Sequence, residues 1–109
     1  MSSSNLDNLV KNNQLKNEPY EQNEFHGLIK SGKTRLRDAN NVTLSEESRF
    51  DLAYNAAHSL ALAALRRLGY RPDNRYVVFQ ALPHTLGVDS GIWRILAKCH
   101  DMRNVAEYA

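Results

Sequence analysis

The sequence predicts an all-α fold, an up-and-down four-helix bundle with a weak extra helix at the N-terminus. Three observations lead to this prediction. Along most of the 109 residues, apolar side chains recur at steps of three, four and seven, which is the period of a helix and not of a strand. The chain has only five glycines and three prolines, too few for a turn-rich sandwich or barrel. Its 42% of hydrophobic and 24% of charged residues are ordinary for one small folded domain.

The N-terminal residues 1–18 are predicted to be a polar, partly mobile segment, and residues 19–109 to form the bundle. Ser4 can cap a short helix in the N-terminal segment, because three apolar residues with helical spacing follow it. Two adjacent asparagines come directly afterwards and weaken this helix. Pro19 ends the segment and suits the first turn of the next helix.

The first main helix is expected over residues 20–39, where Gly32 shares one helical stripe with the apolar side chains. Glycine inside a helix costs about 1 kcal/mol relative to alanine. Its use on this stripe therefore indicates that the backbone of another helix passes close by. The second and longest helix is expected over residues 44–68, with Thr43 and Glu46 forming a capping box at its start.

Two further helices complete the predicted bundle. After Gly69, a natural C′ residue, Asp73 caps a short helix that Pro83 stops or kinks. The run Val77-Val78-Phe79 would by itself suit a strand, but the sequence offers no second strand to pair with it. The last helix is expected from about Gly91 to the end of the chain. Its inward side chains are predicted to be Ile92, Ile95, Leu96, Cys99, Met102 and Ala106.

Charge and composition exclude several classes of protein. Fourteen basic and twelve acidic residues give a net charge of +2, far from the strongly basic profile of a dedicated nucleic-acid binder. The single Cys99 cannot form an internal disulfide, and no cysteines and histidines have the spacing of a zinc site, so we expect neither metal nor cofactor. No signal peptide is evident, and the longest apolar run, residues 60–65, is too short to cross a membrane. The sequence indicates a cytoplasmic protein without membrane partners.

Arg103 is the most informative charged residue, because it continues the apolar stripe of the last predicted helix. An unpaired buried guanidinium costs several kcal/mol, so Arg103 requires partners, and His100 and Glu107 lie one turn on either side. One interpretation is a structural pair of Arg103 with Glu107. The other is a polar pocket for phosphate or RNA, to which Asn55 and His58 of the central helix would contribute; His58 alternatively serves as an ordinary core residue.

Two basic clusters are candidates for contacts with nucleic acid. They also have a plainer interpretation as a solvated helix face and as positive charge that suits the end of a helix. If the two clusters converge in space, they could bind a phosphate backbone, with an affinity that falls steeply as salt rises. The residues are Lys30, Lys33, Arg35, Arg37, Arg66, Arg67, Arg71 and Arg75.

Three motifs resemble those of the HEPN superfamily, small helical-bundle proteins of bacterial toxin–antitoxin and defence systems. The motifs are Tyr54-Asn55-Ala56-Ala57-His58, the exit Gly69-Tyr70-Arg71-Pro72 and the closing Arg103-Asn104-Val105-Ala106-Glu107-Tyr108. The resemblance covers residues 20–109 and is closest to uncharacterised branches whose last motif reads Arg, two residues, Ala, an acid and Tyr. It implies a HEPN-like bundle that forms a homodimer, with a nucleotidyltransferase-type antitoxin as a partner.

The resemblance also implies a test for nuclease activity. RNases of the superfamily use an Arg followed by four to six residues and a His, and they cleave RNA without metal. Here Arg103 and Asn104 match the start of that motif, but Tyr108 stands at the position of the His. An ordinary tyrosine titrates near pH 10 and is poorly suited to acid–base work. His100 lies one turn before Arg103, which inverts the order of the motif.

We therefore expect a binding or interaction module of a toxin–antitoxin or defence-type system, without nuclease activity. Two alternatives remain open. One is a metal-independent endoribonuclease that uses Arg103 and Asn104 with His100 or Tyr108. The other is a small accessory protein that binds RNA or a nucleotide through its arginine clusters.

The C-terminal end carries one more expectation. The last predicted helix stops without a glycine, a basic last turn or a helix breaker. Either a final helix of the bundle is missing through truncation, or a dimer partner covers this end. In the second case, Val105 and Tyr108 are more buried in the oligomer than in the single chain.

Overall fold

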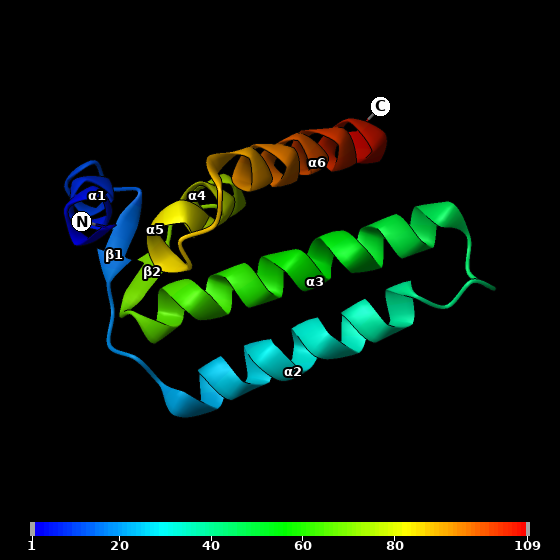
Figure 1. Cartoon of the computed structure of the whole chain (residues 1–109), viewed down its shortest axis with the longest axis horizontal. Coiled ribbons are helices and arrows are strands. Elements are labelled where there is room, and N and C mark those ends of the chain that lie inside the picture. Colours follow the sequence, from blue (N-terminus) through cyan, green and yellow to red (C-terminus); the bar gives the residue numbers. More distant parts are fainter. Residues whose placement is uncertain (1, 109) are drawn as a thin grey trace.

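In the computed structural model, residues 2–108 form six helices and two short strands (Figure 1). The structure describes these residues, except for the side chains of residues 2–4, 90, 93 and 104–108. The elements are α1 Ser2–Lys11, β1 Leu15–Asn17, α2 Gln22–Ala39, α3 Glu46–Arg67, β2 Tyr70–Pro72, α4 Arg75–Gln80, α5 Leu82–Thr85 and α6 Ser90–Tyr108. The prediction of a mostly helical domain is confirmed. Within the described chain, no helix combines the length and the apolar character needed to cross a membrane.

The hairpin of α2 and α3 is the largest layer of the fold, and α6 lies on the other side of α3 (Figure 1). Gly32 of α2 is buried where the two helices meet. A Cβ atom added at Gly32 would lie 2.7 Å from the Leu60 side chain and 3.4 Å from the carbonyl oxygen of Ala56. A side chain at position 32 would require the Leu60 side chain to shift, and the α3 backbone lies in van der Waals contact, which confirms the close helix crossing that the sequence predicted.

The start of α3 differs from the prediction. Its N-cap is Ser45, whose hydroxyl accepts a hydrogen bond from the backbone N–H of Ser48 at 3.1 Å. Thr43 is not the cap, because its backbone N–H and its hydroxyl both donate to Oδ1 of Asn41, at 3.0 and 2.7 Å. This local turn holds Thr43 outside the helix, so the predicted capping box with Glu46 does not form.

The segment after α3 begins with a turn of the predicted kind. Gly69 has a φ of +89°, the left-handed conformation that favours glycine after a helix. Asn74, and not the predicted Asp73, caps α4, because its Oδ1 accepts from the N–H of Val77 at 3.1 Å. Pro83 lies in the first turn of α5, a position where its missing N–H costs nothing.

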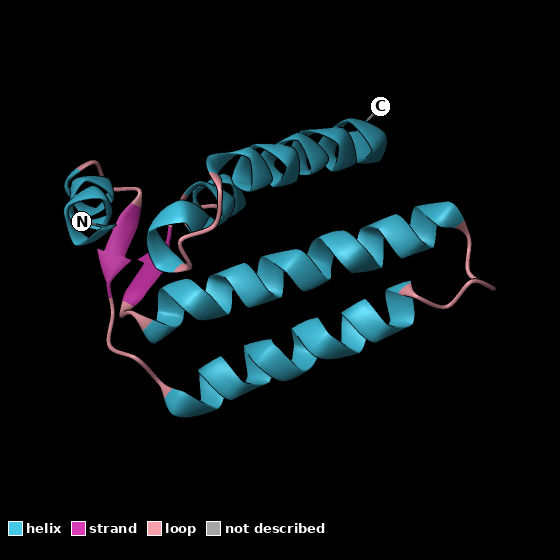
Figure 2. Cartoon of the chain, viewed as in Figure 1, coloured by secondary structure: helices cyan, strands magenta, loops and turns pink. Residues whose placement is uncertain are grey.

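The N-terminal segment is joined to the rest of the fold by a two-stranded sheet that the sequence did not predict (Figure 2). Strand β1 pairs antiparallel with β2, with Leu15 opposite Pro72 and Asn17 opposite Tyr70. Leu15 and Leu6 are 1% and 3% exposed and belong to the main hydrophobic cluster. Their apolar side chains therefore stabilise the N-terminal segment against the core, although most of its residues are polar.

The predicted inner face of α6 is wrong in part. Ile92, Ile95 and Met102 are 46%, 64% and 54% exposed, whereas Ala97 is buried. Leu96 and Cys99 are half-buried, and the side chain of Ala106 lies outside the described residues. The cause is the polar face of α6, because His100 and Arg103 turn toward α3 to meet partners there. This rotation carries Ile95 and Met102 to the surface.

A buried arginine at the end of α3 connects four segments of the chain. Arg66 is 1% exposed, and its guanidinium donates to Oε1 of Glu24 and to the carbonyl oxygen of Pro19, both at 2.8 Å. It also donates to the carbonyl oxygens of Tyr70 and Glu18, at 3.0 and 3.1 Å. All sides of the guanidinium are thus occupied by acceptors from the same chain. Arg66 is a structural residue and is not available to a nucleic acid, contrary to the prediction.

Arg71 of β2 completes the same network. It forms ion pairs with Oε2 of Glu18 at 2.5 Å and with Oε2 of Glu24 at 2.6 Å. The hydrogen bonds from Arg71 and Arg66 hold the pKa of the Glu24 carboxyl below its usual range. A nucleic acid that bound Arg71, as the sequence predicted, would therefore have to compete with the two carboxylates that already pair with it.

Replacing Arg66 with alanine is expected to lower the free energy of unfolding by about 3–5 kcal/mol, because it leaves a carboxylate and several carbonyls without their donor. Urea unfolding measures this effect. Arg94→Ala, on the exposed surface of α6, is the matched control and is expected to cost less than about 0.5 kcal/mol. An Arg66 variant as stable as the control would contradict the structural role assigned to this residue.

Candidate functional site

Tyr54 of α3 is the centre of a polar cluster where α3, α4 and α6 meet. Its side chain is 3% exposed and packs edge-on against Phe79 of α4, with ring centroids 5.8 Å apart. The Tyr54 hydroxyl and Nδ1 of His100 form a hydrogen bond of 2.8 Å. The buried hydroxyl thus has a partner, as tyrosines in protein interiors require, and this bond fixes the position of α6.

Two arginines from different helices lie against the Tyr54 ring. The guanidinium carbons of Arg75 and Arg103 are 5.6 and 5.5 Å from the ring centroid. Both distances allow attraction between a cation and the face of an aromatic ring. Nε of Arg103 donates to Oδ1 of Asp51 at 3.2 Å, so a carboxylate balances this charge.

Arg75 differs from the other arginines of the fold core in its surroundings. It donates a hydrogen bond of 3.1 Å to Oδ1 of Asn55, whose own amide nitrogen donates to the carbonyl oxygen of Asp51 at 2.9 Å. Asn55 is thereby held with its oxygen toward Arg75. Among the side chains that the structure describes, no carboxylate pairs with Arg75. This half-buried guanidinium can therefore accept an external anion without first breaking an ion pair.

His58 lies beside Arg75 and packs edge-on against Phe79 at 6.0 Å. Burial, together with electrostatic repulsion from Arg75 and His100, lowers the pKa of His58 to about 4. The imidazole is consequently neutral at pH 7. A neutral imidazole offers one N–H donor and one acceptor nitrogen, which suits hydrogen bonding to a ligand more than storage of a proton.

The structure brings together four of the residues that the sequence singled out, Asn55, His58, His100 and Arg103. The side chains of Asn104, Val105, Glu107 and Tyr108 lie outside the described residues. The suggested pair of Arg103 with Glu107 therefore stays a prediction. Among the described side chains, the carboxylate of Asp51 on α3 forms an ion pair with Arg103.

Sequence reasoning did not assign Asp51, Tyr54 or Arg75 to this pocket. A signal for the first two exists, since positions 51, 54, 55 and 58 follow the i, i+3, i+4, i+7 pattern of one helix face. The alanines of α3 conceal this polar stripe, because apolar residues on several faces of the helix indicate that all of it is buried. Arg75 was recognised only as part of a basic cluster, and its approach to Tyr54 depends on how α4 folds back onto α3.

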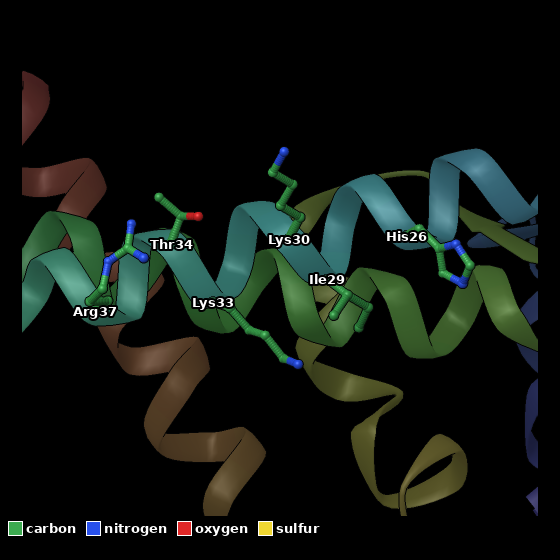
Figure 3. Close-up of a pocket in the computed structure, with 6 residues that line it drawn as sticks. All are labelled: His26, Ile29, Lys30, Lys33, Thr34 and Arg37. Carbon is green, nitrogen blue, oxygen red and sulfur yellow. The ribbon is translucent and has the colours of Figure 1, made fainter.

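Two arginines of the second basic cluster are held in ion pairs and do not join the first cluster on one surface. Arg66 and Arg71 are tied to Glu18 and Glu24, as described above. Arg67 is exposed and lies over the Tyr20 ring at 4.6 Å. The cluster on α2 is also exposed, and three of its residues line a shallow surface hollow together with His26 (Figure 3). That hollow is lined by His26, Ile29, Lys30, Lys33, Thr34 and Arg37. Arg35 lies nearby and is hydrogen-bonded to Ser31.

No group of three metal-ligating side chains occurs in the part of the chain that the structure describes. Comparison of the chain with protein-family models, with curated proteins and with solved structures found no match. We use the name Tyr54 cluster for the residues Asp51, Tyr54, Asn55, His58, Arg75, His100 and Arg103.

The geometry of the Tyr54 cluster indicates its chemistry. Two guanidinium groups beside a neutral imidazole form a set of donors that fits a phosphate group better than an uncharged ligand.

His58 is expected to make stability depend on pH between about 6.5 and 4. In this range the unfolded chain binds a proton that folded His58 takes up only near pH 4, so the free energy of unfolding falls as the pH is lowered. Removing the imidazole with His58→Asn should flatten this part of the curve, measured by urea unfolding at each pH. His26→Asn, on the exposed face of α2, is the control and should keep the parent slope. Equal slopes for both variants would contradict the assignment.

Proposed function

We propose that this chain is a HEPN-like binding module of a bacterial toxin–antitoxin or defence-type system, acting in the cytoplasm, and that its Tyr54 cluster binds a phosphate group of RNA or of a nucleotide. One observation carries the proposal, the guanidinium of Arg75, which is half-buried, oriented by Asn55 and without a carboxylate partner among the described side chains. The likeness of the three motifs to the HEPN superfamily supports the rest of the assignment, including the up-and-down bundle.

Phosphate is the anion favoured by the donors around Arg75. A guanidinium presents a planar fork of N–H groups that matches two phosphate oxygens at once. Arg103 supplies a second cation on the same aromatic ring, and the carboxylate of Asp51, with which it forms an ion pair, is exposed to solvent. Neutral His58 adds a hydrogen bond without adding charge. An RNA backbone or a nucleotide phosphate offers both the negative charge and the several acceptor oxygens that this set of donors requires.

The expected protein partners are also part of the proposal. We propose a homodimer, as in the superfamily, and a nucleotidyltransferase-type antitoxin as the second partner. Exposed Ile92, Ile95 and Met102 on α6 provide apolar surface for such contacts. Sedimentation equilibrium of the parent chain and of Ile95→Glu tests the homodimer, because a charge at a dimer contact should shift the mass toward that of the monomer.

Substituting Arg75 with glutamine is expected to weaken binding of a short single-stranded RNA at least about tenfold, the loss of one charge-assisted hydrogen-bonded contact. Fluorescence anisotropy with a labelled oligoribonucleotide at low salt measures this affinity, and the salt dependence should become less steep in the variant. Arg94→Gln, which removes the same charge from the exposed side of α6, controls for net charge. If both variants lose the same affinity, binding is merely electrostatic and the Tyr54 cluster is not the site.

Metal-independent RNA cleavage is the second candidate function, favoured by the close approach of His58, His100 and Arg103 around Tyr54. A histidine whose pKa is about 4 is a weak base at pH 7, so any cleavage is expected to be slow. The same RNA incubated with excess EDTA and analysed on denaturing gels distinguishes the two functions. Cleavage that both Arg103→Ala and His100→Ala abolish would make the chain a nuclease; intact RNA with the parent protein would leave binding as its function.

A further inference from the structure

An apolar groove lies on a different face of α3 from the Tyr54 cluster. It has a volume of about 360 Å³, and its walls come from α2, α3 and the end of α5. Leu68 and Leu86 at its rim are 51% and 60% exposed, so two large apolar side chains border it in contact with water. The groove is lined by Phe25, Ile29, Leu60, Ala64, Arg67, Leu68, Thr85 and Leu86.

Positive charge borders this groove on two sides. Ile29 lines both the groove and the basic hollow of α2, so the two depressions adjoin at this residue. Ile29 and Lys33 lie along one edge of α2 in Figure 3 and Lys30 along the other edge, and all three side chains line the basic hollow. Arg67 lies at the other rim, where its only described interaction is with the Tyr20 ring. Among the described residues that line the two depressions there is no acid.

The groove also has the dimensions of a helix-binding surface. Leu60, Ala64 and Leu68 follow one another at steps of four along α3, and Phe25 and Ile29 do the same on α2. Eight residues of helix extend about 12 Å, which is the length of two turns of a bound helix. Apolar side chains spaced i, i+3, i+4 and i+7 on a partner helix would therefore meet apolar side chains along the whole groove.

We propose that this surface, which we call the α2–α3 groove, docks an acidic amphipathic helix of a partner protein. Apolar side chains of the partner enter between α2 and α3, and its flanking carboxylates meet Lys33 and His26 on one side and Arg67 on the other. An exposed apolar patch with a charged border is typical of a protein-binding site, and the basic side chains on this border select acidic partners and repel basic ones. The proposal does not depend on the function assigned to the Tyr54 cluster, since the two surfaces share no residue.

The other occupants with a negative charge fit the groove less well. A nucleic acid would place sugars and bases against walls that offer almost no hydrogen-bonding group, since Thr85 and Arg67 are the polar residues of the lining. A lipid bilayer would contact Leu68 and Leu86 at the rim but would leave the space above the recessed side chains of Leu60 and Ala64 empty. A helix with projecting side chains fills both the rim and the floor.

A displayed peptide library provides the first test. The probes are helical peptides of about 16 residues, long enough for an isolated helix. Four positions spaced i, i+3, i+4 and i+7 vary among Leu, Ile, Phe and Ala, and four flanking positions vary between Glu and Lys. Selection on the full-length protein is expected to enrich large apolar side chains together with Glu. Enrichment of Lys, or no enrichment over a scrambled-order library, overturns the proposal.

Variants of the protein then locate the contact of the best acidic peptide by fluorescence anisotropy. Lys33→Glu is expected to weaken binding at least tenfold and to reverse the preference between the Glu and Lys forms of the peptide. Leu68→Ser should weaken it at least threefold, because it removes part of the apolar rim. Lys98→Glu, on the exposed side of α6, is the matched control for charge and should leave the affinity unchanged.

Three results would overturn the docking of a helix. One is a peptide affinity that responds equally to Lys33→Glu and Lys98→Glu. The second is sedimentation with phosphatidylglycerol vesicles that Lys33→Glu abolishes, in the absence of peptide binding, which would assign the surface to a membrane. The third is a concentration-dependent dimer, seen by light scattering, that Leu68→Ser dissociates, which would assign the groove to a second copy of the chain.

Discussion

The guanidinium of Arg66 is the constraint on which the arrangement of the remaining elements depends. A buried positive charge must be surrounded by acceptors, and here those acceptors come from the segment before α2, from α2 itself and from β2. Satisfying Arg66 therefore fixes the chain at residues 18–24 and at Tyr70 in one place. Tyr70 begins the strand that leads to the cap of α4, so the position of Arg75 follows from the same set of bonds.

Three arginines of this fold illustrate how the same side chain takes on different roles. Arg66 is saturated by acceptors and contributes to the architecture. Arg103 forms an ion pair with the exposed carboxylate of Asp51 and lies against an aromatic ring. Arg75 has an amide and the same ring, and no carboxylate among the described side chains. The acceptors around each guanidinium, and not its position in a basic run, distinguish Arg66 as a structural residue from Arg75 as the candidate ligand-binding residue.

The sequence predicted those parts of the structure that local interactions determine. The two long helices, the close crossing at Gly32 and the turn at Gly69 all follow from patterns within a few residues. The pairing of β1 with β2 and the contacts of Arg66 join residues far apart in the chain, and strands of three residues are too short to show a period. The face of α6 was mispredicted for a related reason, because hydrophobic spacing ignores the polar partners that α3 offers to His100 and Arg103.

The pairing of β1 with β2 has a consequence for how the chain acquires its structure. The hairpin of α2 and α3 depends on neighbouring segments and can form early, whereas the N-terminal strand must find a partner that follows both helices. During synthesis, α1 and β1 leave the ribosome before β2 and have nothing to pair with until β2 has emerged. Leu6 and Leu15 are exposed to water until then, which makes this segment a natural point of contact for chaperones and proteases.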